Sequence, residues 1–277
     1  MRPPESSAAA PACILITGAS SGIGAALARA FAERGEALLL TARRRERLEA
    51  LAQELRQAHG VTVEVAPCDL AAEGAAASLR AEWRRRGLHL KGLVNNAGFG
   101  LRGEFDHLDP LEAQRMLQVL VQAAVELSQF ALPEIRQQPD GFLLTVASLA
   151  GLVPGLAGSA LYSACKAFLI RFSQALAAEQ GADGVRVLVL CPGYVRSEFH
   201  AQLGAQERIQ QLPGWFWMEA DDLARRTLRA LEGQAVVVVP GLVNQAIALL
   251  ARFLPEPLAR QLSRRFSRRY RQADTTT

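Results

Sequence analysis

The chain is poor in the residues that build disulfide frameworks and metal sites. Its four cysteines, Cys13, Cys68, Cys165 and Cys191, are scattered, with no CxxC pair and no histidine at metal-ligand spacing. Isolated cysteines without a secretory signal are typical of free thiols in a reducing compartment. We therefore expect a cytoplasmic protein without a metal site.

Long apolar runs and a strong overall charge are also absent. No apolar run reaches the roughly 18 residues that a membrane span needs. The formal net charge is +4, and the stretch from Arg252 onward alone carries seven arginines against Glu256 and Asp274, a net +5. The rest of the chain is near neutral, which argues against nucleic-acid binding. Residues 1–11 lack the apolar core of a signal peptide and are expected to be a loose leader.

What the chain does have is a regular alternation of short apolar runs and helical patterns. CILIT (13–17), EALLLTA (36–42), LKGLVNN (90–96) and GFLLTVAS (141–148) each contain an apolar run, as strands buried on both faces do. Such alternation predicts a parallel sheet. We expect one α/β domain over residues 12–241, a doubly wound Rossmann-type sheet flanked by helices, and a basic amphipathic extension over residues 242–277.

A glycine-rich turn, TGASSGIG (17–24), separates the first expected strand from the first expected helix. Its glycines allow a tight turn and a close approach of the backbone to a phosphate. The helix that follows offers free N–H groups and a partial positive charge to an anion. Glycine also serves ordinary turns, but after the first strand of a βαβ unit this loop predicts a dinucleotide site.

Tyr162 and Lys166 lie four residues apart in LYSACK and therefore share one face of a predicted helix. A solvated polar stripe would explain the pair without any chemistry. Alternatively, the phenol of Tyr162 is a proton donor in a reaction. The pKa of a free phenol is about 10, and a nearby ammonium stabilises the phenolate and lowers that pKa. We therefore expect Lys166 to lower the pKa of Tyr162.

The spacing TGxxxGxG, together with YxxxK, resembles the short-chain dehydrogenase/reductase family from Cys13 to about Pro240. The motifs CDL (68–70), NNAG (95–98), VASLAG (146–151) and CPGYVRS (191–197) follow in the family's order. The resemblance implies that Ser148, Tyr162 and Lys166 are catalytic, with Ser148 donating a hydrogen bond to the substrate oxygen. It implies cofactor binding by Gly18, Ser20, Ser21, Gly22, Ile23, Gly24, Asp69, Asn96, Ala97, Gly98, Tyr162, Lys166, Pro192, Gly193, Val195 and Ser197.

The cofactor is predicted from the end of the second strand. An NAD site usually has an acidic residue about 20 residues beyond the glycine loop. Here Thr41 and Ala42 carry no carboxylate, and Arg43 follows at once. An arginine suits the 2′-phosphate of NADP(H) through charge-assisted bonds. The alternative is that Arg43 to Arg45 begin a solvated helix, as we expect for Arg44 and Arg45.

The chain departs from the family at Leu120, where many members keep an asparagine that holds a water in a proton relay. A leucine side chain cannot do so, and on a helix Gln118 and Gln122 face elsewhere. A smaller departure is the distance from Ser148 to Tyr162, which is one residue longer than usual. A glycine-bearing loop absorbs such an insertion.

The substrate and the tail leave alternatives open. Residues 198–222 are expected to form a flap over the substrate. Its cluster Trp215, Phe216, Trp217 and Met218 either suits a large apolar substrate or packs the flap on the core. The tail either lies in an anionic membrane interface or docks on the body or on a second subunit, and we favour docking. We assign no role to His107 or His200, and we expect a homo-oligomer.

Two functions remain. The first is an NADP(H)-dependent oxidoreductase that interconverts a carbonyl and an alcohol on a small apolar substrate. The second is a cofactor-binding sensor or scaffold with weak catalysis, as Leu120 hints. Retention of Ser148, Tyr162 and Lys166 favours the enzyme, because a scaffold has no physical need for all three.

Overall fold

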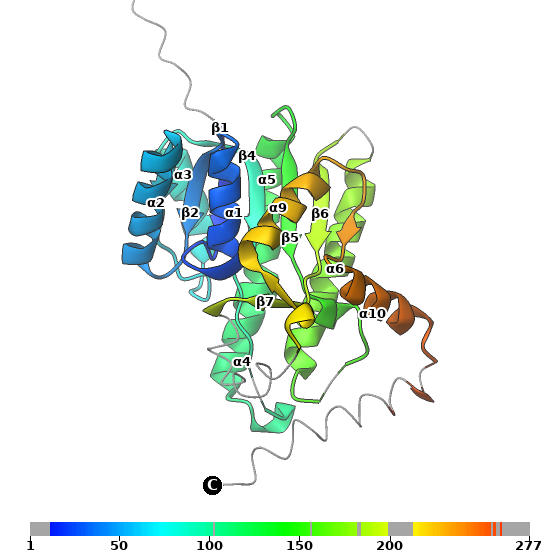
Figure 1. The fold of residues 1–277 in the computed structure, drawn as a ribbon. Coiled ribbons are helices and arrows are strands. Elements are labelled where there is room, and N and C mark those ends of the chain that lie inside the picture. Colours follow the sequence, from blue (N-terminus) through cyan, green and yellow to red (C-terminus); the bar gives the residue numbers. More distant parts are fainter. Residues whose placement is uncertain are drawn as a thin grey trace, which may run out of the picture.

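The computed structural model describes residues 12–101, 103–155, 157–181, 184–198, 213–255, 257–258 and 261 (Figure 1). Its centre is a seven-stranded parallel sheet in the order β3-β2-β1-β4-β5-β6-β9. Because β1 lies between β2 and β4, the direction of winding reverses there, and the predicted doubly wound sheet is confirmed. The strands are β1 (Ala12–Thr17), β2 (Ala37–Thr41), β3 (Val63–Val65), β4 (His89–Asn95), β5 (Phe142–Val146), β6 (Arg186–Leu190) and β9 (Val237–Val238).

Helices cover both faces of this sheet (Figure 1). One face packs against α1 (Gly22–Glu33), α2 (Arg45–His59) and α9 (Ala220–Leu231). The other packs against α3 (Ala75–Arg85), α5 (Ala123–Ile135) and α6 (Ala160–Gln180). In β1, Ile14 and Ile16 belong to the first core and Cys13 and Leu15 to the second, all at most 2% exposed. Continuous apolar runs therefore mark strands that are buried on both faces.

The helical stretch that runs from Pro110 to Ile135 has an irregular turn in its middle. Asp109 caps α4 (Pro110–Leu117) by accepting a hydrogen bond from the Leu111 amide at 2.9 Å. A π-helical turn, η2 (Gln118–Gln122), then leads directly into α5. Such turns are frequent at functional sites, and this one carries Leu120.

Smaller elements lie beyond the carboxyl ends of the strands. They are the 3₁₀ turns η1 (Phe105–His107), η3 (Leu149–Gly151) and η4 (Gly214–Phe216), and the paired strands β7 (Tyr194–Arg196) and β8 (Trp217–Glu219). Helix α10 (Leu242–Phe253) follows β9 at the edge of the sheet. Among the described residues, no helix combines the length and hydropathy needed to cross a bilayer.

The division into leader, domain and extension stays a prediction. The leader (1–11), residues 199–212 of the expected flap, which include His200, and most of the tail from 259 onward lie outside the described residues.

Candidate active and cofactor-binding site

The candidate site lies where the carboxyl ends of β1, β4, β5 and β6 meet. The loops that leave these strands carry the glycine-rich turn, the NNAG motif, Ser148 and the Pro192–Gly193 pair. This is also the place where the winding of the sheet reverses, and open α/β sheets bind ligands in the crevice at such a point.

The glycine loop has the shape of an anion cradle. Gly18 and Gly22 have φ values of +67° and +55°, a conformation that other residues rarely adopt. A Cβ on Gly24 would overlap the Gly18 carbonyl oxygen, so a side chain does not fit there. Ser21, the N-cap of α1, makes no side-chain capping bond, and the first turn of α1 holds no acidic residue. The free N–H groups of α1 therefore suit the pyrophosphate of a dinucleotide.

The neighbouring NNAG loop is tied to β1 by Thr17. The Thr17 hydroxyl donates to the Val94 carbonyl at 3.1 Å and accepts from the amides of Asn96 and Ala97 at 2.9 Å. The Asn96 side chain donates to the Thr17 carbonyl at 2.8 Å. Sequence reasoning missed Thr17, although a polar residue that ends an apolar strand was the available signal.

A second bond holds NNAG from the helical side. The Asn95 side chain donates to the hydroxyl of Ser128 in α5 at 3.0 Å. Both residues are buried. The sequence carries no local signal for this pair, because 33 residues separate them.

Ser148, Tyr162 and Lys166 come together as predicted. Ser148 follows β5, and a hydrogen bond joins its hydroxyl to that of Tyr162 in α6. The Lys166 ammonium donates to the Val146 carbonyl at 2.8 Å and lies 5.6 Å from the centre of the Tyr162 ring. Lys166 is only 5% exposed. An ammonium has three donors, so this buried lysine has two more to offer.

The electrostatics of the pair differ from our expectation. Burial raises the pKa of Tyr162 to about 12, and the hydrogen bond from Ser148 opposes that rise. Burial also lowers the pKa of Lys166 to about 8. The prediction that Lys166 lowers the pKa of Tyr162 below the ordinary value is wrong for this structure, because burial destabilises the phenolate and the contribution that opposes burial comes from Ser148.

The loop after β6 is fastened to Ser148. The Ser148 amide donates to the thiol of Cys191, and burial raises the pKa of that thiol to about 12. The Leu149 amide donates to the Pro192 carbonyl at 2.9 Å. Cys191 therefore holds Ser148 as an uncharged thiol, and no local pattern in the sequence predicts that these two residues meet.

The remaining residues of this loop reach the glycine turn and α10. Ser197 lies beside Gly22, where an added Cβ would be 3.0 Å from the Ser197 Cβ. Val195 is buried in β7. A Cβ on Gly193 would clash with Asn244 of α10, whose amide donates to the Pro240 carbonyl at 2.8 Å.

Comparison with known proteins agrees with this geometry. Residues 12–208 match the family described as short chain dehydrogenase. The chain belongs to the short-chain dehydrogenase family. It is an oxidoreductase of alcohol and carbonyl groups that binds a nicotinamide dinucleotide.

Three members of the family illustrate the similarity. An uncharacterized oxidoreductase of Myxococcus xanthus is 35% identical over 254 residues, which cover 91% of this chain and 96% of the relative. The NADP-dependent 3-hydroxy acid dehydrogenase YdfG of Salmonella typhi is 36% identical, over 66% of this chain and 72% of its own. The structure of a short-chain dehydrogenase from Sphingobium yanoikuyae in complex with NADPH is 30% identical with a TM-score of 0.75, and covers 88% and 97% of the two chains.

Within this short-chain dehydrogenase, Arg44 rather than Arg43 contacts the glycine loop. Arg44 donates to the Ser21 hydroxyl at 2.8 Å and to the Ser20 hydroxyl at 3.1 Å. The second terminal nitrogen of Arg44, Nη1, donates to the Glu198 carboxylate at 3.0 Å. Arg43 is exposed and makes no hydrogen bond or ion pair with the part of the chain that the structure describes. The expectation that Arg44 merely begins a solvated helix is therefore not met.

Asp69, the family's expected adenine contact, is held in place by two bonds. It accepts from the Ala71 amide at 3.0 Å and forms an ion pair of 3.3 Å with Arg115 of α4. Ile23 is half-buried against the core on the α1 side of the sheet.

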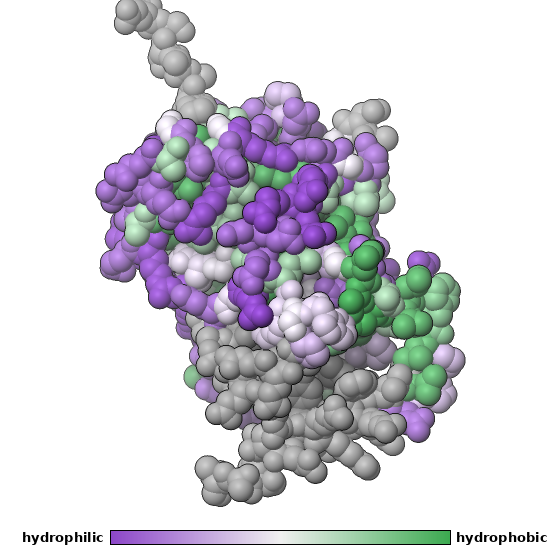
Figure 2. Space-filling model, viewed as in Figure 1, coloured by the Kyte–Doolittle hydropathy of each residue, from purple (hydrophilic) through white to green (hydrophobic). Residues whose placement is uncertain are grey.

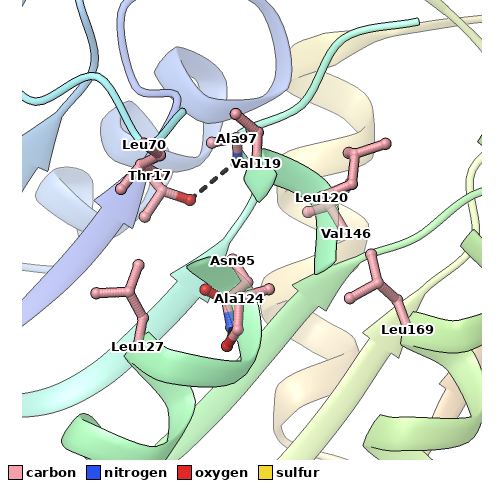
Figure 3. Close-up of a pocket in the computed structure, with 10 residues that line it drawn as sticks. All are labelled: Thr17, Leu70, Asn95, Ala97, Val119, Leu120, Ala124, Leu127, Val146 and Leu169. Carbon is pink, nitrogen blue, oxygen red and sulfur yellow. Dashed lines mark hydrogen bonds between the residues drawn. The ribbon is translucent and has the colours of Figure 1, made fainter. Parts of the chain in front are cut away.

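Leu120 occupies the place of the family's relay asparagine and is 1% exposed. A Cβ on Gly98 would lie 2.6 Å from its Cδ2 and 3.9 Å from the Lys166 ammonium. Leu120 helps to line a cavity of about 10 Å³, close to the least volume that holds a water. Figure 3 shows its lining, in which only Thr17 and Asn95 carry polar side chains.

The two glutamines near Leu120 do not replace the asparagine. Gln122 is exposed and donates to Glu126 at 2.8 Å, so it points away from the site. Gln118 does not line the cavity.

The flap aromatics divide between the two alternatives. Trp217, in β8, contacts Tyr194 with ring centres 5.6 Å apart, and Met218 packs against the core. Trp215 stacks on Phe216 at 3.9 Å and is 62% exposed. In the described part of the flap, packing accounts for Trp217 and Met218, and Trp215 stays available for another contact.

Proposed function

We propose that this short-chain dehydrogenase interconverts a carbonyl and an alcohol on an apolar substrate and uses NADP(H). The observation that carries the proposal is the grouping of Ser148, Tyr162 and Lys166 beside an anion-binding glycine loop. When bound, the cofactor supplies or accepts the hydride. The glycine loop, the NNAG loop and the remaining donors of Lys166 fit such a dinucleotide.

In the reducing direction, the Tyr162 hydroxyl gives its proton to the substrate oxygen. The Ser148 hydroxyl donates a hydrogen bond to the same oxygen as negative charge develops there. A tyrosine with a raised pKa is protonated at neutral pH, so the donor is ready for reduction. With the cofactor bound, the remaining donors of Lys166 would hold its ribose, and the ammonium, 5.6 Å from the Tyr162 ring, would help to stabilise the phenolate left behind.

The surroundings of Tyr162 favour an apolar substrate. Phe99, Leu101 and Leu161 pack with Tyr162 around the buried group of Met116, Leu120 and Cys165. A charged substrate would lose its hydration there without gaining a partner in this cluster.

The preference for NADP(H) is inferred from Arg44. Its guanidinium already binds a carboxylate, that of Glu198, and Arg47 donates to the same carboxylate at 2.5 Å. These bonds, first from Arg47 and then from Arg44, hold the pKa of Glu198 below its usual range. A 2′-phosphate can take the place of that carboxylate, since both offer two anionic oxygens to the two N–H groups of a guanidinium. Arg43, exposed beside Arg44, remains a second candidate for the same phosphate.

The cofactor experiment measures dissociation constants of NADPH and NADH for the wild type, Arg43→Ala, Arg44→Ala and the control Arg45→Ala. Arg44→Ala removes charge-assisted bonds worth about 1.5–3 kcal/mol. It should therefore weaken NADPH binding about tenfold or more and leave the affinity for NADH almost unchanged. Glu198→Gln should tighten NADPH binding, because a competing charge is gone. Equal losses for both cofactors would mean that Arg44 only supports the glycine loop.

The activity experiment follows NADPH oxidation across apolar ketones and aldehydes. Tyr162→Phe should lower turnover about 10²-fold or more at unchanged cofactor affinity, since only the proton donor is removed. Ser163→Ala, next in the helix, is the matched control. Turnover near that of the wild type in the phenylalanine variant would mean that Tyr162 is not the proton donor. A wild type that binds NADPH without reducing any compound of the panel would favour the sensor or scaffold that Leu120 suggests.

A further inference from the structure

Helix α10 presents a row of large apolar side chains to the outside of the protein. Leu242, Leu249, Leu250 and Phe253 are 84%, 59%, 70% and 73% exposed. The polar residue Asn244 instead faces the body, where it contacts Gly193 and Pro240. The inner side also carries the half-buried Ile247, Ala248 and Ala251, so α10 is apolar around most of its circumference. An ordinary surface helix instead turns polar and charged residues to the solvent.

The exposed residues form one continuous stripe. Leu242, Ala246, Leu249, Leu250 and Phe253 have the spacing i, i+4, i+7, i+8 and i+11, which places them on one side of a helix. We call them the outer stripe of α10. Figure 2 shows green, hydrophobic atoms over α10 at the edge of the molecule, whereas α1 and α2 are mostly purple.

The charge of the residues that follow the outer stripe indicates which kind of partner the stripe binds. The single charged residue of α10 is Arg252, and residues 252–277 hold seven arginines against Glu256 and Asp274. A second copy of this chain would set the same net +5 against itself. An anionic lipid surface offers the opposite charge to the arginines and hydrocarbon to the stripe.

We propose that the outer stripe and the arginine-rich segment after it bind the surface of an anionic membrane. At 1.5 Å per residue, a helix of 12 residues is about 18 Å long, too short to span a bilayer and long enough to lie in its interface. The sequence alone led us to favour docking of the tail, and the exposure of α10 reverses that preference. Because Asn244 on the inner side touches Gly193, the binding face adjoins the loop of the catalytic site.

The test is co-flotation with vesicles, with full-length protein and NADPH present. Vesicles contain either phosphatidylcholine alone or an equal mixture with phosphatidylglycerol. We expect binding to the mixed vesicles, and binding about tenfold weaker or more both to phosphatidylcholine alone and at about 0.5 M salt. The double variant Leu250→Ser/Phe253→Ser should reduce binding to the mixed vesicles about tenfold or more.

Leu111→Ser in α4 is the matched control, because Leu111 is 69% exposed and Leu250 is 70% exposed. It should bind vesicles as the wild type does. NADPH affinity and circular dichroism verify that each variant is folded.

Three results would overturn the proposal. One is wild-type protein that ignores mixed vesicles, and another is a double variant that binds them as tightly as the wild type. The third is a stable dimer that the double variant dissociates while no form binds vesicles, which would make the stripe a contact between copies. A failure of carbonyl reduction would leave these results unaffected, because vesicle binding does not require turnover.

Discussion

At the residue scale, the burial of Lys166 couples the site to the stability of the fold. Its pKa is about 8 in the folded protein against an ordinary value of 10.5. Between these values the unfolded chain binds more protons than the folded protein, so the free energy of unfolding rises with pH. Below about pH 8 the ammonium is charged in both states, and its desolvation lowers stability by a constant amount.

Lys166→Met should therefore have a higher free energy of unfolding than the wild type near pH 7. The gain is on the order of 3 kcal/mol, and it should shrink as the pH rises from 8 towards 10. Urea denaturation at several pH values measures it. The raised pKa of Tyr162 applies to both proteins and cancels in the difference, whereas the Lys166 charge lowers the pKa of Cys191, so the contribution of that thiol differs between the two proteins at high pH. A difference that does not change with pH would show that the ammonium is not desolvated.

At the scale of one element, the π-helical turn η2 is formed without the asparagine that the family places there. Leu120 fills the space beside Gly98 with a methyl group instead of an amide. The turn therefore depends on packing with Met116 and Cys165 rather than on a polar contact of its side chain. A water in the adjoining cavity has Thr17 and Asn95 as polar neighbours, and Lys166 is not part of the lining.

Leu120→Asn tests whether the missing amide limits proton supply. The variant should lose about 1–3 kcal/mol of stability if the buried amide lacks a full set of partners. Turnover should rise where proton transfer is rate-limiting. A solvent isotope effect on the wild type provides the control, because its absence would mean that proton delivery is not limiting. Leu117→Asn, at an exposed position of α4, is the matched substitution.

At the scale of the whole molecule, the cofactor site joins elements from both halves of the sheet. Thr17 of β1 binds the loop of β4, Ser148 after β5 binds the loop of β6, and Ser197 reaches the glycine turn. A ligand that bridges these loops binds the folded state and not the unfolded chain.

NADPH at about 100 times its dissociation constant should therefore stabilise the protein by about 2.7 kcal/mol, seen as a higher Tm in calorimetry. NADH at the same concentration should raise the Tm less, and Arg44→Ala should reduce the NADPH shift towards that of NADH. Equal shifts by both cofactors in the wild type would contradict the inferred role of Arg44.

The fold and the grouping of Ser148, Tyr162 and Lys166 were predictable from the sequence. Uninterrupted apolar runs imply strands buried on both faces, and an alternation of strand and helix implies a parallel sheet. Ser148, Tyr162 and Lys166 followed from a resemblance carried by short motifs in a fixed order, and the structure groups them. The tight turn at Gly18 and Gly22 was likewise predictable, because these glycines lie between a strand pattern and a helix pattern.

Only the tertiary structure decided contacts between segments far apart in the chain. Nothing local distinguishes Arg43 from Arg44, because the direction of each side chain depends on where α2 begins and on Glu198, 154 residues later. The direction of the pKa shift of Tyr162 needed the burial around it, and the bond from Ser148 to Cys191 needed two adjacent strands. The same holds for α10, whose apolar stripe could face inward or outward until the packing of Asn244 against Gly193 set its rotation.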